Sequence, residues 1–127
     1  MYTDLLAQIK NAQAVKKDSI KIPASKLDEM VLKLLVNRRF IESFDKKGRG
    51  IKKVLSVKIR YTEDGNGAIN GVRLLSKPSR HLYVGYKDIR KVRSGYGLLV
   101  ISTPQGIMSG EDARKAKLGG EVFFEVW

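Results

Sequence analysis

Residues 96–109, with the sequence YGLLVISTPQGIMS, decide how the C-terminal half of this chain folds. Tyr96 to Ile101 is strongly apolar and predicts a strand. Ser102 to Gly106 is polar and contains a proline and a glycine, so we expect a loop there. A short polar helix is predicted from about Ser109 to Lys117, because acidic residues fall in its first turn and basic residues in its last. Glu121 to Trp127 then predicts a closing strand.

Upstream of this stretch, the second half of the chain is also predicted to be mostly strand. Ala68 to Leu75 and Leu82 to Tyr86 are the candidate strands, and Ser76 to Ser79 is a turn between them. Asp88 to Val92 is expected to form a short turn or helix. The strong turn signal at 63–67, EDGNG, precedes all of these segments, and we place the boundary between two lobes there.

The first half of the chain predicts two helices. The first covers residues 3–17, with Thr3 or Asp4 as its cap. The second opens on Ser25 and ends near Arg39, and Asp28 can supply the acidic part of a capping box. It has the clearest amphipathic pattern in the chain, with apolar residues at i, i+3, i+4, i+7 and i+8: Leu27, Met30, Val31, Leu34 and Leu35.

Three short segments of the first half are predicted to be extended. Ser19 to Ile22 is stopped by the proline that follows it. Phe40 to Phe44 is the second strand, and a basic turn is expected at Lys46 to Gly50. Leu55 to Tyr61 alternates apolar and polar residues, which is typical of a half-buried strand.

The charge of the chain is its most unusual property. Hydrophobic residues make up 43% of the 127 and charged residues 30%, both ordinary for a folded protein of one domain or two small lobes. Twenty-five Lys and Arg against thirteen Asp and Glu leave a formal charge of +12. Because such an excess opposes compaction by self-repulsion, a polyanionic partner is expected. Nucleic acid comes first as that partner and an anionic membrane surface second.

The absence of cysteine excludes several functions at once. The chain can form no disulfide, no thiolate zinc site and no thiol nucleophile, and this composition fits a reducing cytosol. We expect no signal peptide, since the N-terminus carries no positive cluster followed by an apolar core. No apolar run approaches the roughly 18 to 20 residues of a membrane helix.

Basic residues gather in two clusters. The first lies between residues 46 and 60 and contains no acid: Lys46, Lys47, Arg49, Lys52, Lys53, Lys58 and Arg60. The second lies between residues 73 and 93 with one acid, Asp88: Arg73, Lys77, Arg80, Lys87, Arg90, Lys91 and Arg93. Tyr83, Tyr86 and Tyr96 are interleaved with the second cluster. Any single lysine is explained by a solvated surface, but the clusters together favour phosphate contacts, with aromatic rings that can stack on unpaired bases or riboses.

The segment 102–109 carries groups that can recognise RNA. Its Ser and Thr hydroxyls can bond base edges and ribose hydroxyls, Gly106 permits close approach of backbone, and amides at the start of the next helix can hold a phosphate. Gly119-Gly120-Glu121 offers a second close approach and a carboxylate acceptor. Ordinary local roles are the alternative: residues 102 and 103 end a strand, Ser109 caps a helix and Gly119 terminates it.

The whole chain resembles one known family. The run 102–109, STPQGIMS, followed by Ala113-Arg114 and by 119–122, GGEV, closely resembles the C-terminal signature of the eighth protein of the small ribosomal subunit in its bacterial form. Residues 9–12, IKNA, are similar to that family's first helix, and 23–27, PASKL, to the lead into its second. Phe40-Ile41-Glu42 and Ser76-Lys77-Pro78 fall in the expected order.

This resemblance implies an α+β fold of two small lobes. The N-terminal lobe, 1–65, would pack two helices on a small sheet, and the C-terminal lobe, 66–127, would be strand-rich with one short helix and would recognise RNA. The protein would be a structural constituent of the small ribosomal subunit that binds the central domain of 16S ribosomal RNA directly and helps its assembly. The alternative is a free regulatory RNA-binding protein that represses translation of its own operon messenger RNA. Neighbouring small-subunit proteins would be further partners, in the cytoplasm or, for a plastid-encoded chain, on an organellar ribosome.

By position, the resemblance also implies which residues contact RNA. The face would centre on a set from the C-terminal half: Ser102, Thr103, Gln105, Gly106, Ser109, Gly119, Gly120 and Glu121. Tyr83 would contact RNA from the neighbouring strand. Lys77, Pro78, Arg80, Lys10 and Asn11 would give supporting contacts.

Three other functions are weaker readings of the same residues. An enzyme would need a partner that orients His81, the single histidine, and the sequence points to none, so we predict no catalytic residue, cofactor, metal site or small-molecule substrate. A protein that reads DNA would gather basic side chains on one helix face, whereas Lys26, Lys33 and Arg38 are scattered around the second predicted helix. A membrane-surface protein would need a basic amphipathic helix, and these helices have the pattern of core helices.

Overall fold

The computed structural model of the protein describes residues 2–77, 79–90 and 97–127. It divides into two units, Met1–Ile69 and Asn70–Trp127. The α+β prediction is confirmed, because the first unit packs helices on a small sheet and the second is strand-rich with a short helix. The lobes 1–65 and 66–127 stay a prediction as functional domains.

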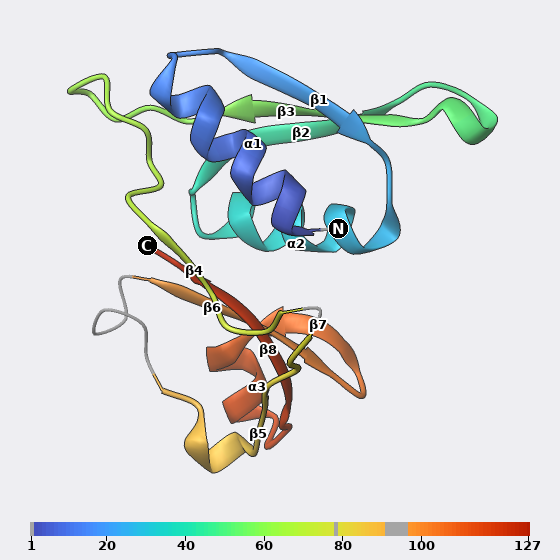
Figure 1. The fold of residues 1–127 in the computed structure, drawn as a ribbon, viewed down its shortest axis with the longest axis vertical. Helices are drawn as coiled ribbons and strands as arrows, with labels where there is room; N and C mark the ends of the chain where they lie inside the picture. The colour runs from blue at the N-terminus through green and yellow to red at the C-terminus, as the bar shows by residue number, and fades with distance from the viewer. Residues whose placement is uncertain (1, 78, 91–96) are drawn as a thin grey trace. The chain divides into compact units, whose positions relative to one another are not determined.

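The first unit contains a three-stranded antiparallel sheet with two helices on one of its faces (Figure 1). Its elements follow one another along the chain as α1 (Tyr2–Ala14), β1 (Ser19–Pro23), α2 (Lys26–Asn37), β2 (Ile41–Lys47), a 3-10 turn (Gly50–Lys52) and β3 (Val54–Ile59). The strand order is β1-β3-β2, so β3 is central.

Alternation along β3 builds the core of this unit. Leu55, Val57 and Ile59 are buried, and Ile22 and Ile20 of β1 lie opposite the first two. Since paired residues of antiparallel strands share a face, these side chains form one apolar layer. The helices meet it with buried residues at helical spacing: Leu5 and Ile9 of α1, and Val31, Leu32 and Leu35 of α2.

Helix starts are partly as predicted. Ser25 caps α2, and its Oγ accepts a hydrogen bond from the amide of Asp28 at 3.1 Å, which confirms the serine half of the capping box. The Asp28 carboxylate is buried, and its Oδ1 has no hydrogen-bond partner among the described residues. The cap expected at Thr3 or Asp4 is wrong, because α1 already begins at Tyr2 and both residues lie in its first turn.

The three helices that the structure describes each end near a basic residue with a left-handed backbone. Lys16, Arg39 and Lys117 have φ of 59°, 61° and 58°. The amide that follows each of them bonds to a carbonyl five residues back, at 2.8–2.9 Å, which closes the helix end. The glycine stop predicted at Gly119 is therefore wrong, since Lys117 makes the turn before the glycine is reached.

The buried side chain of Gln13 joins the end of α1 to the segment that follows β3 through two hydrogen bonds. The Gln13 Nε2 donates to the Ile69 carbonyl at 2.9 Å, and its Oε1 accepts from the Ile69 amide at 3.1 Å. A Cβ on Gly67 would lie 2.2 Å from the Gln13 side chain, so the chain passes this amide without room for a larger residue. The end of α1 thus fixes the segment that leaves β3.

The second unit is a five-stranded antiparallel sheet with one short helix. Its elements are β4 (Val72–Leu74), β5 (Tyr83–Val84), a 3-10 turn (Tyr86–Asp88), β6 (Leu98–Thr103), β7 (Gly106–Ser109), α3 (Gly110–Lys115) and β8 (Gly120–Val126). The strand order is β4-β8-β6-β7, and β5 also pairs with β8. Strand β8, the last of the chain, therefore pairs with three other strands.

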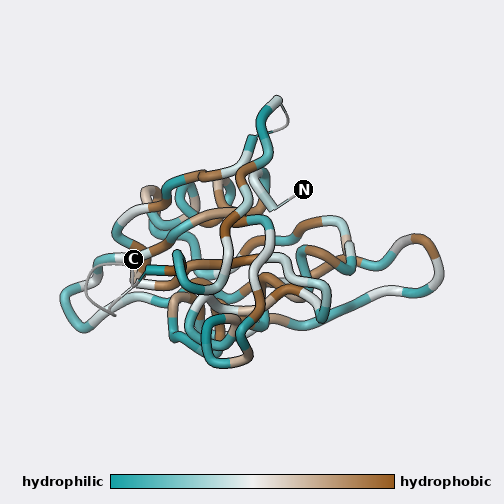
Figure 2. Tube along the Cα trace, turned by 90° about the horizontal axis from the view of Figure 1, so that it is seen from below, coloured by the Kyte–Doolittle hydropathy of each residue, from teal (hydrophilic) through white to brown (hydrophobic). Residues whose placement is uncertain are grey.

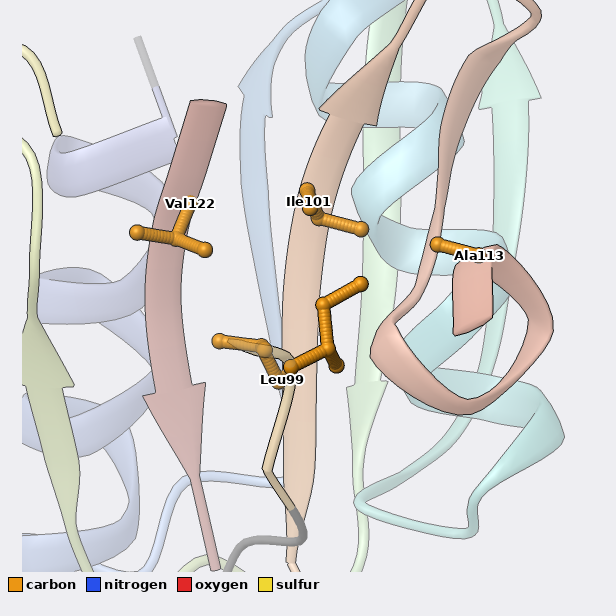
Figure 3. Close-up of a cluster of buried hydrophobic side chains, with 5 residues drawn as sticks. Leu99, Ile101, Ala113 and Val122 are labelled. Atoms are coloured by element: carbon orange, nitrogen blue, oxygen red, sulfur yellow. The ribbon is translucent and has the colours of Figure 1, made fainter. Parts of the chain in front are cut away.

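Helix α3 covers one face of this sheet. Figure 3 shows Leu99 and Ile101 on β6, with Val122 of the neighbouring strand on one side and Ala113 of α3 on the other. These side chains and Ile89 form a buried apolar cluster. In Figure 2 the loop at the left is hydrophilic, whereas the loop that projects at the right has a hydrophobic tip between hydrophilic flanks.

Several strand boundaries differ from the predictions. The strand expected at 68–75 is reduced to Val72–Leu74, and the backbone of Ile69 before it bonds the Gln13 side chain of α1 instead of a strand. The strand expected at 82–86 is cut to two residues by the 3-10 turn after it. Strand β2 continues through residues 46 and 47, so that part of the basic turn is strand. Residues 91, 92 and 96 lie outside the described residues.

The left-handed residue after α3 generates a test of stability. Lys117→Gly should be more stable than Lys117→Ala by about 1 kcal/mol, because both remove the charge and only glycine relieves the backbone strain. At Lys115, inside α3, the order should reverse, with glycine less stable than alanine by about 1 kcal/mol. Urea unfolding of the four variants measures both differences. Equal stability of the two Lys117 variants would contradict the strain.

Candidate nucleic-acid interface

The segment predicted as a recognition loop is a β-hairpin. Strands β6 and β7 pair from Val100↔Ser109 to Thr103↔Gly106, which leaves only Pro104 and Gln105 as the turn. Gly106 has a φ of 117°, a conformation that favours glycine. The loop predicted at 102–106 is therefore confirmed only at Pro104 and Gln105, and it is wrong for Ser102, Thr103 and Gly106, which belong to the paired strands.

The Thr103 side chain stabilises the turn of the hairpin. Its Oγ1 donates to the Gly106 carbonyl at 2.8 Å and accepts from the Gln105 amide at 3.2 Å. The residue is only 8% exposed. Since the hydroxyl proton is committed to Gly106, Thr103 shapes the turn that presents Gln105, which is exposed.

The Ser109 side chain also has a structural role, as the N-cap of α3. It is 7% exposed, and its Oγ accepts from the amide of Asp112 at 3.2 Å as the N-cap of α3. This confirms the alternative reading of Ser109 as a helix cap. It also confirms the helix predicted after the segment, which runs from Gly110 to Lys115.

The glycine pair at the start of β8 is surrounded by the protein's own backbone. A Cβ on Gly120 would lie 1.9 Å from the Ser102 carbonyl oxygen, and one on Gly119 would lie 2.5 Å from the Val84 carbonyl oxygen. No side chain fits at such distances. The close approach predicted at these glycines is thus between strands of this chain, with β6 on one side and β5 on the other.

This close packing aligns four residues across the sheet. Glu121 lies opposite both Tyr83 of β5 and Ser102 of β6, and Ser102 lies opposite Ile107 of β7. We call these four residues the cross-strand row. Paired residues share a face, so the row forms one line across four strands.

The cross-strand row lies on the face opposite α3. The next residue on each strand, namely Val84, Val122, Ile101 and Met108, packs in or against the apolar cluster under α3. Side chains alternate along a strand, so the row points the other way. Tyr83 is 68% exposed, and the other three are partly exposed.

Sequence reasoning missed a partner of Glu121. The His81 Nδ1 lies 2.8 Å from the Glu121 Oε2, and the His81 side chain is 56% exposed while that of Glu121 is 18% exposed. The two residues are forty positions apart, so only the pairing of β5 with β8 brings them together. Among the described residues no hydrogen bond joins His81 to Ser102, so the three do not form a nucleophilic triad.

A buried serine positions the turn before Tyr83. The Ser76 Oγ donates to the Val122 carbonyl at 2.6 Å and accepts from the Leu82 amide at 3.0 Å. Between these anchors, the backbones of Lys77 and Arg80 bond each other at 2.9 and 3.0 Å, and both side chains are exposed. Pro78 lies outside the described residues.

Two predicted site residues belong to the other unit. Lys10 is partly exposed and Asn11 exposed, and both lie on α1. The structure therefore gathers Tyr83, Ser102 and Glu121 in one row with Gln105 and Gly106 on the adjoining hairpin, whereas Lys10 and Asn11 belong to α1 of the first unit. Lys91, Arg93 and Tyr96 of the second basic cluster lie outside the described residues.

Two kinds of feature are absent from the described part of the chain. It contains no group of three or more His, Cys, Asp or Glu residues that could hold a metal ion. No helix in it is long and apolar enough to cross a membrane.

Comparison with known proteins supports one family over the full length. The model of the family described as Ribosomal protein S8 matches residues 1–127. A small ribosomal subunit protein uS8 of Nautilia profundicola is 42% identical over 124 residues, 98% of this chain and 95% of the relative. The protein of that name from Campylobacter fetus is 38% identical over 127 residues, 100% and 97% of the two chains. That of Novosphingobium aromaticivorans is 41% identical over 124 residues, 98% and 94%.

These matches define the chain as an RNA-binding ribosomal protein of the small subunit, a structural component of the translation machinery and not an enzyme. It belongs to the ribosomal protein S8 family. The resemblance found in the C-terminal signature is confirmed by this match over the whole length.

The contact between β8 and β6 generates a test of the interface. Gly120→Ala should destabilise the protein by several kcal/mol or prevent folding, because its Cβ would overlap the Ser102 carbonyl. Gly85→Ala is the matched control, since its φ is −81° and its Cβ would have open space, with Asp88 Oδ2 the nearest atom at 4.0 Å. Thermal unfolding followed by circular dichroism compares the two. Equal unfolding midpoints of the two variants would show that the pairing of β8 with β6 does not require a glycine at position 120.

Proposed function

We propose that the chain binds the central domain of small-subunit ribosomal RNA directly, through the cross-strand row, and helps that domain to assemble. The observation that carries the proposal is the row itself, which aligns an exposed tyrosine, a carboxylate and a hydroxyl on the open face of the second unit's sheet. RNA helices with irregular regions expose ribose hydroxyls and base edges that such groups can bond.

The contacting groups divide by chemistry. The exposed ring of Tyr83 can stack on an unpaired base or a ribose, and the Ser102 hydroxyl can bond a ribose hydroxyl or a base edge. Glu121, held by His81, can accept from a base amino group. The Gln105 side chain and the Gly106 backbone extend the surface along the hairpin.

A second group of predicted site residues acts by shaping this surface. Thr103 holds the turn, Ser109 caps α3, and Gly119 with Gly120 lets three strands approach one another. Their contribution to RNA binding is indirect, because their polar groups or their missing side chains serve the packing of β5, β6 and β8.

Basic residues would supply attraction that does not depend on sequence. Lys77 and Arg80 are exposed beside the row, and Lys10 with Asn11 would add contacts from α1. Each phosphate neutralised by a lysine or arginine releases counterions, so this part of the affinity should fall as salt rises. The role of Pro78 stays a prediction.

Repression of the protein's own operon messenger RNA stays a prediction from the resemblance. No contact among the described residues favours messenger RNA over ribosomal RNA, and a messenger that mimics the ribosomal site would use the same row. We place the ribosome concerned in the cytoplasm, because the relatives named above come from bacteria. Nothing among them favours an organelle.

Ser102 and Thr103 should differ sharply when each hydroxyl is removed. Ser102→Ala should weaken binding to the central-domain RNA by about 1 to 3 kcal/mol and leave the unfolding midpoint unchanged, since no hydrogen bond to its hydroxyl is found among the described residues. Thr103→Val should instead lower the stability of the protein by about 1 kcal/mol, because it removes two bonds of the turn. Filter binding and urea unfolding of both variants give the two readouts.

A scrambled RNA of equal length is the control for Ser102. If Ser102→Ala weakened binding to the cognate and the scrambled RNA equally, Ser102 would not be a reader of the site.

Tyr83 tests stacking apart from hydrogen bonding. Tyr83→Ala should cost about 1 to 3 kcal/mol of affinity for the central-domain RNA, the usual contribution of a stacked aromatic ring. Tyr83→Phe should retain most of that affinity, because the ring remains. Fluorescence titration measures both, and an equal loss in the two variants would assign Tyr83 to hydrogen bonding and exclude stacking.

A further inference from the structure

We propose that the open face of the first unit's sheet is a second RNA-binding surface, which holds the sugar-phosphate backbone of a double-stranded segment. We call it the sheet face, and it consists of residues from all three strands: Ser19, Lys21, Ser43, Asp45, Lys47, Ser56 and Lys58. Only the nature of its partner, RNA, rests on the proposed function. The surface itself is defined by the register of the strands.

The central strand divides its residues between the two faces. Leu55, Val57 and Ile59 are buried on the side that α1 and α2 cover (Figure 1). The alternate residues Ser56 and Lys58 must point away from the helices, because side chains alternate along a strand. Ser56 is partly exposed and Lys58 exposed, as that direction requires.

The outer strands add polar residues in line with these two. Lys58 lies opposite Ser19 on β1 and opposite Ser43 on β2. Ser56 lies opposite Lys21 and Asp45 in the next row.

A third row has Val54 between Pro23 and Lys47. The rows place three hydroxyls and three ammonium groups on one surface, together with a single carboxylate.

The lysines of the sheet face differ from the lysine on the helix side. Lys46 lies opposite Leu55, and its Nζ is 3.6 Å from the Glu29 Oε2 of α2. Within the part of the chain that the structure describes, Lys21, Lys47 and Lys58 form no ion pair, and all three are exposed. The positive charge of this face is therefore available to a partner.

The dimensions and chemistry of the face fit duplex RNA. Adjacent strands are about 4.8 Å apart and successive residues on one face about 6.7 Å apart, so three rows on three strands span roughly 10 by 13 Å. The minor groove of an A-form helix is wide and shallow and displays 2′-hydroxyls between its phosphates. Serine hydroxyls can bond the 2′-hydroxyls while the lysines neutralise the phosphates. An acidic protein would satisfy the lysines but would not need three hydroxyls between them.

The first experiment removes the three lysines of the face. The full-length triple variant K21Q/K47Q/K58Q and a control triple, K26Q/K33Q/K115Q, lose the same net charge from exposed positions. Affinity for an A-form RNA duplex is measured by fluorescence anisotropy over a series of salt concentrations. The slope of log affinity against log salt should fall in magnitude by about 2 to 3 for the sheet-face variant and hardly change for the control, since each phosphate contact contributes about 0.9.

The second experiment changes the binding in the opposite direction. Asp45 places a negative charge in the middle row, so Asp45→Asn should tighten duplex binding about two- to fivefold, the size of exposed charge interactions. Glu63→Gln removes a charge from the exposed turn after β3 and should change nothing. A gain of affinity cannot come from misfolding, so this result remains decisive even if the triple variant is destabilised.

Failure of this proposal and failure of the proposed function give different patterns. If the two lysine triples had equal slopes and Asp45→Asn bound like wild type, the sheet face would not bind RNA, and Ser102→Ala would still report on the row. If Ser102→Ala kept full affinity for central-domain RNA while the sheet-face triple lost duplex binding, the row would fail and the sheet face would stand. If the sheet-face triple variant lost binding to a neighbouring small-subunit protein but kept duplex binding, the face would be a protein interface, and the proposal would be overturned.

Discussion

The approach of the β8 backbone to β6 is the constraint on which the second unit depends. Gly120 passes so close to the Ser102 carbonyl that a Cβ would lie 1.9 Å from the oxygen. Because neither Gly120 nor Gly119 has a side chain, β8 can pair closely with β6 and β5, and Glu121 comes to lie between Ser102 and Tyr83. The row proposed to contact RNA thus depends on two neighbouring glycines.

Polar residues in the second unit have two different roles. Some are buried and hold the fold around the cross-strand row, and others belong to the row and face outward. Thr103, Ser109 and Ser76 are buried, and their hydroxyls hold a turn, a helix start and the segment before Tyr83. Satisfied buried hydroxyls of this kind make a polar region rigid. Ser102 and Tyr83 then face outward beside segments that these hydrogen bonds hold in position. Recognition of an irregular RNA helix requires such fixed positions, because the contacts depend on shape as much as on charge.

Much of the fold follows from local patterns, but the chemistry of the site does not. The alternation in β3 predicted the strand with its buried face. The period of apolar residues in α2 predicted the helix, but only Val31 and Leu35 of the predicted stripe are buried. Composition misled at Ser102 and Thr103, since polar residues with a nearby proline and glycine resemble a loop. It also misled at the helix ends, where Lys16, Arg39 and Lys117 adopt the conformation usually given to glycine. His81 carried no signal, because its partner Glu121 is distant in sequence.

The sequence by itself determined the α+β class, the family and the basic character of the surface, because these depend on local periodicity, on a recognisable signature and on the count of charges. Only the tertiary structure decided which polar groups face outward. Thr103 and Ser102 are adjacent and chemically alike, yet one hydroxyl is buried in a turn and the other lies in a row with residues from β8 and β5. That difference arises from strand register and pleat, which are fixed by pairing between distant segments.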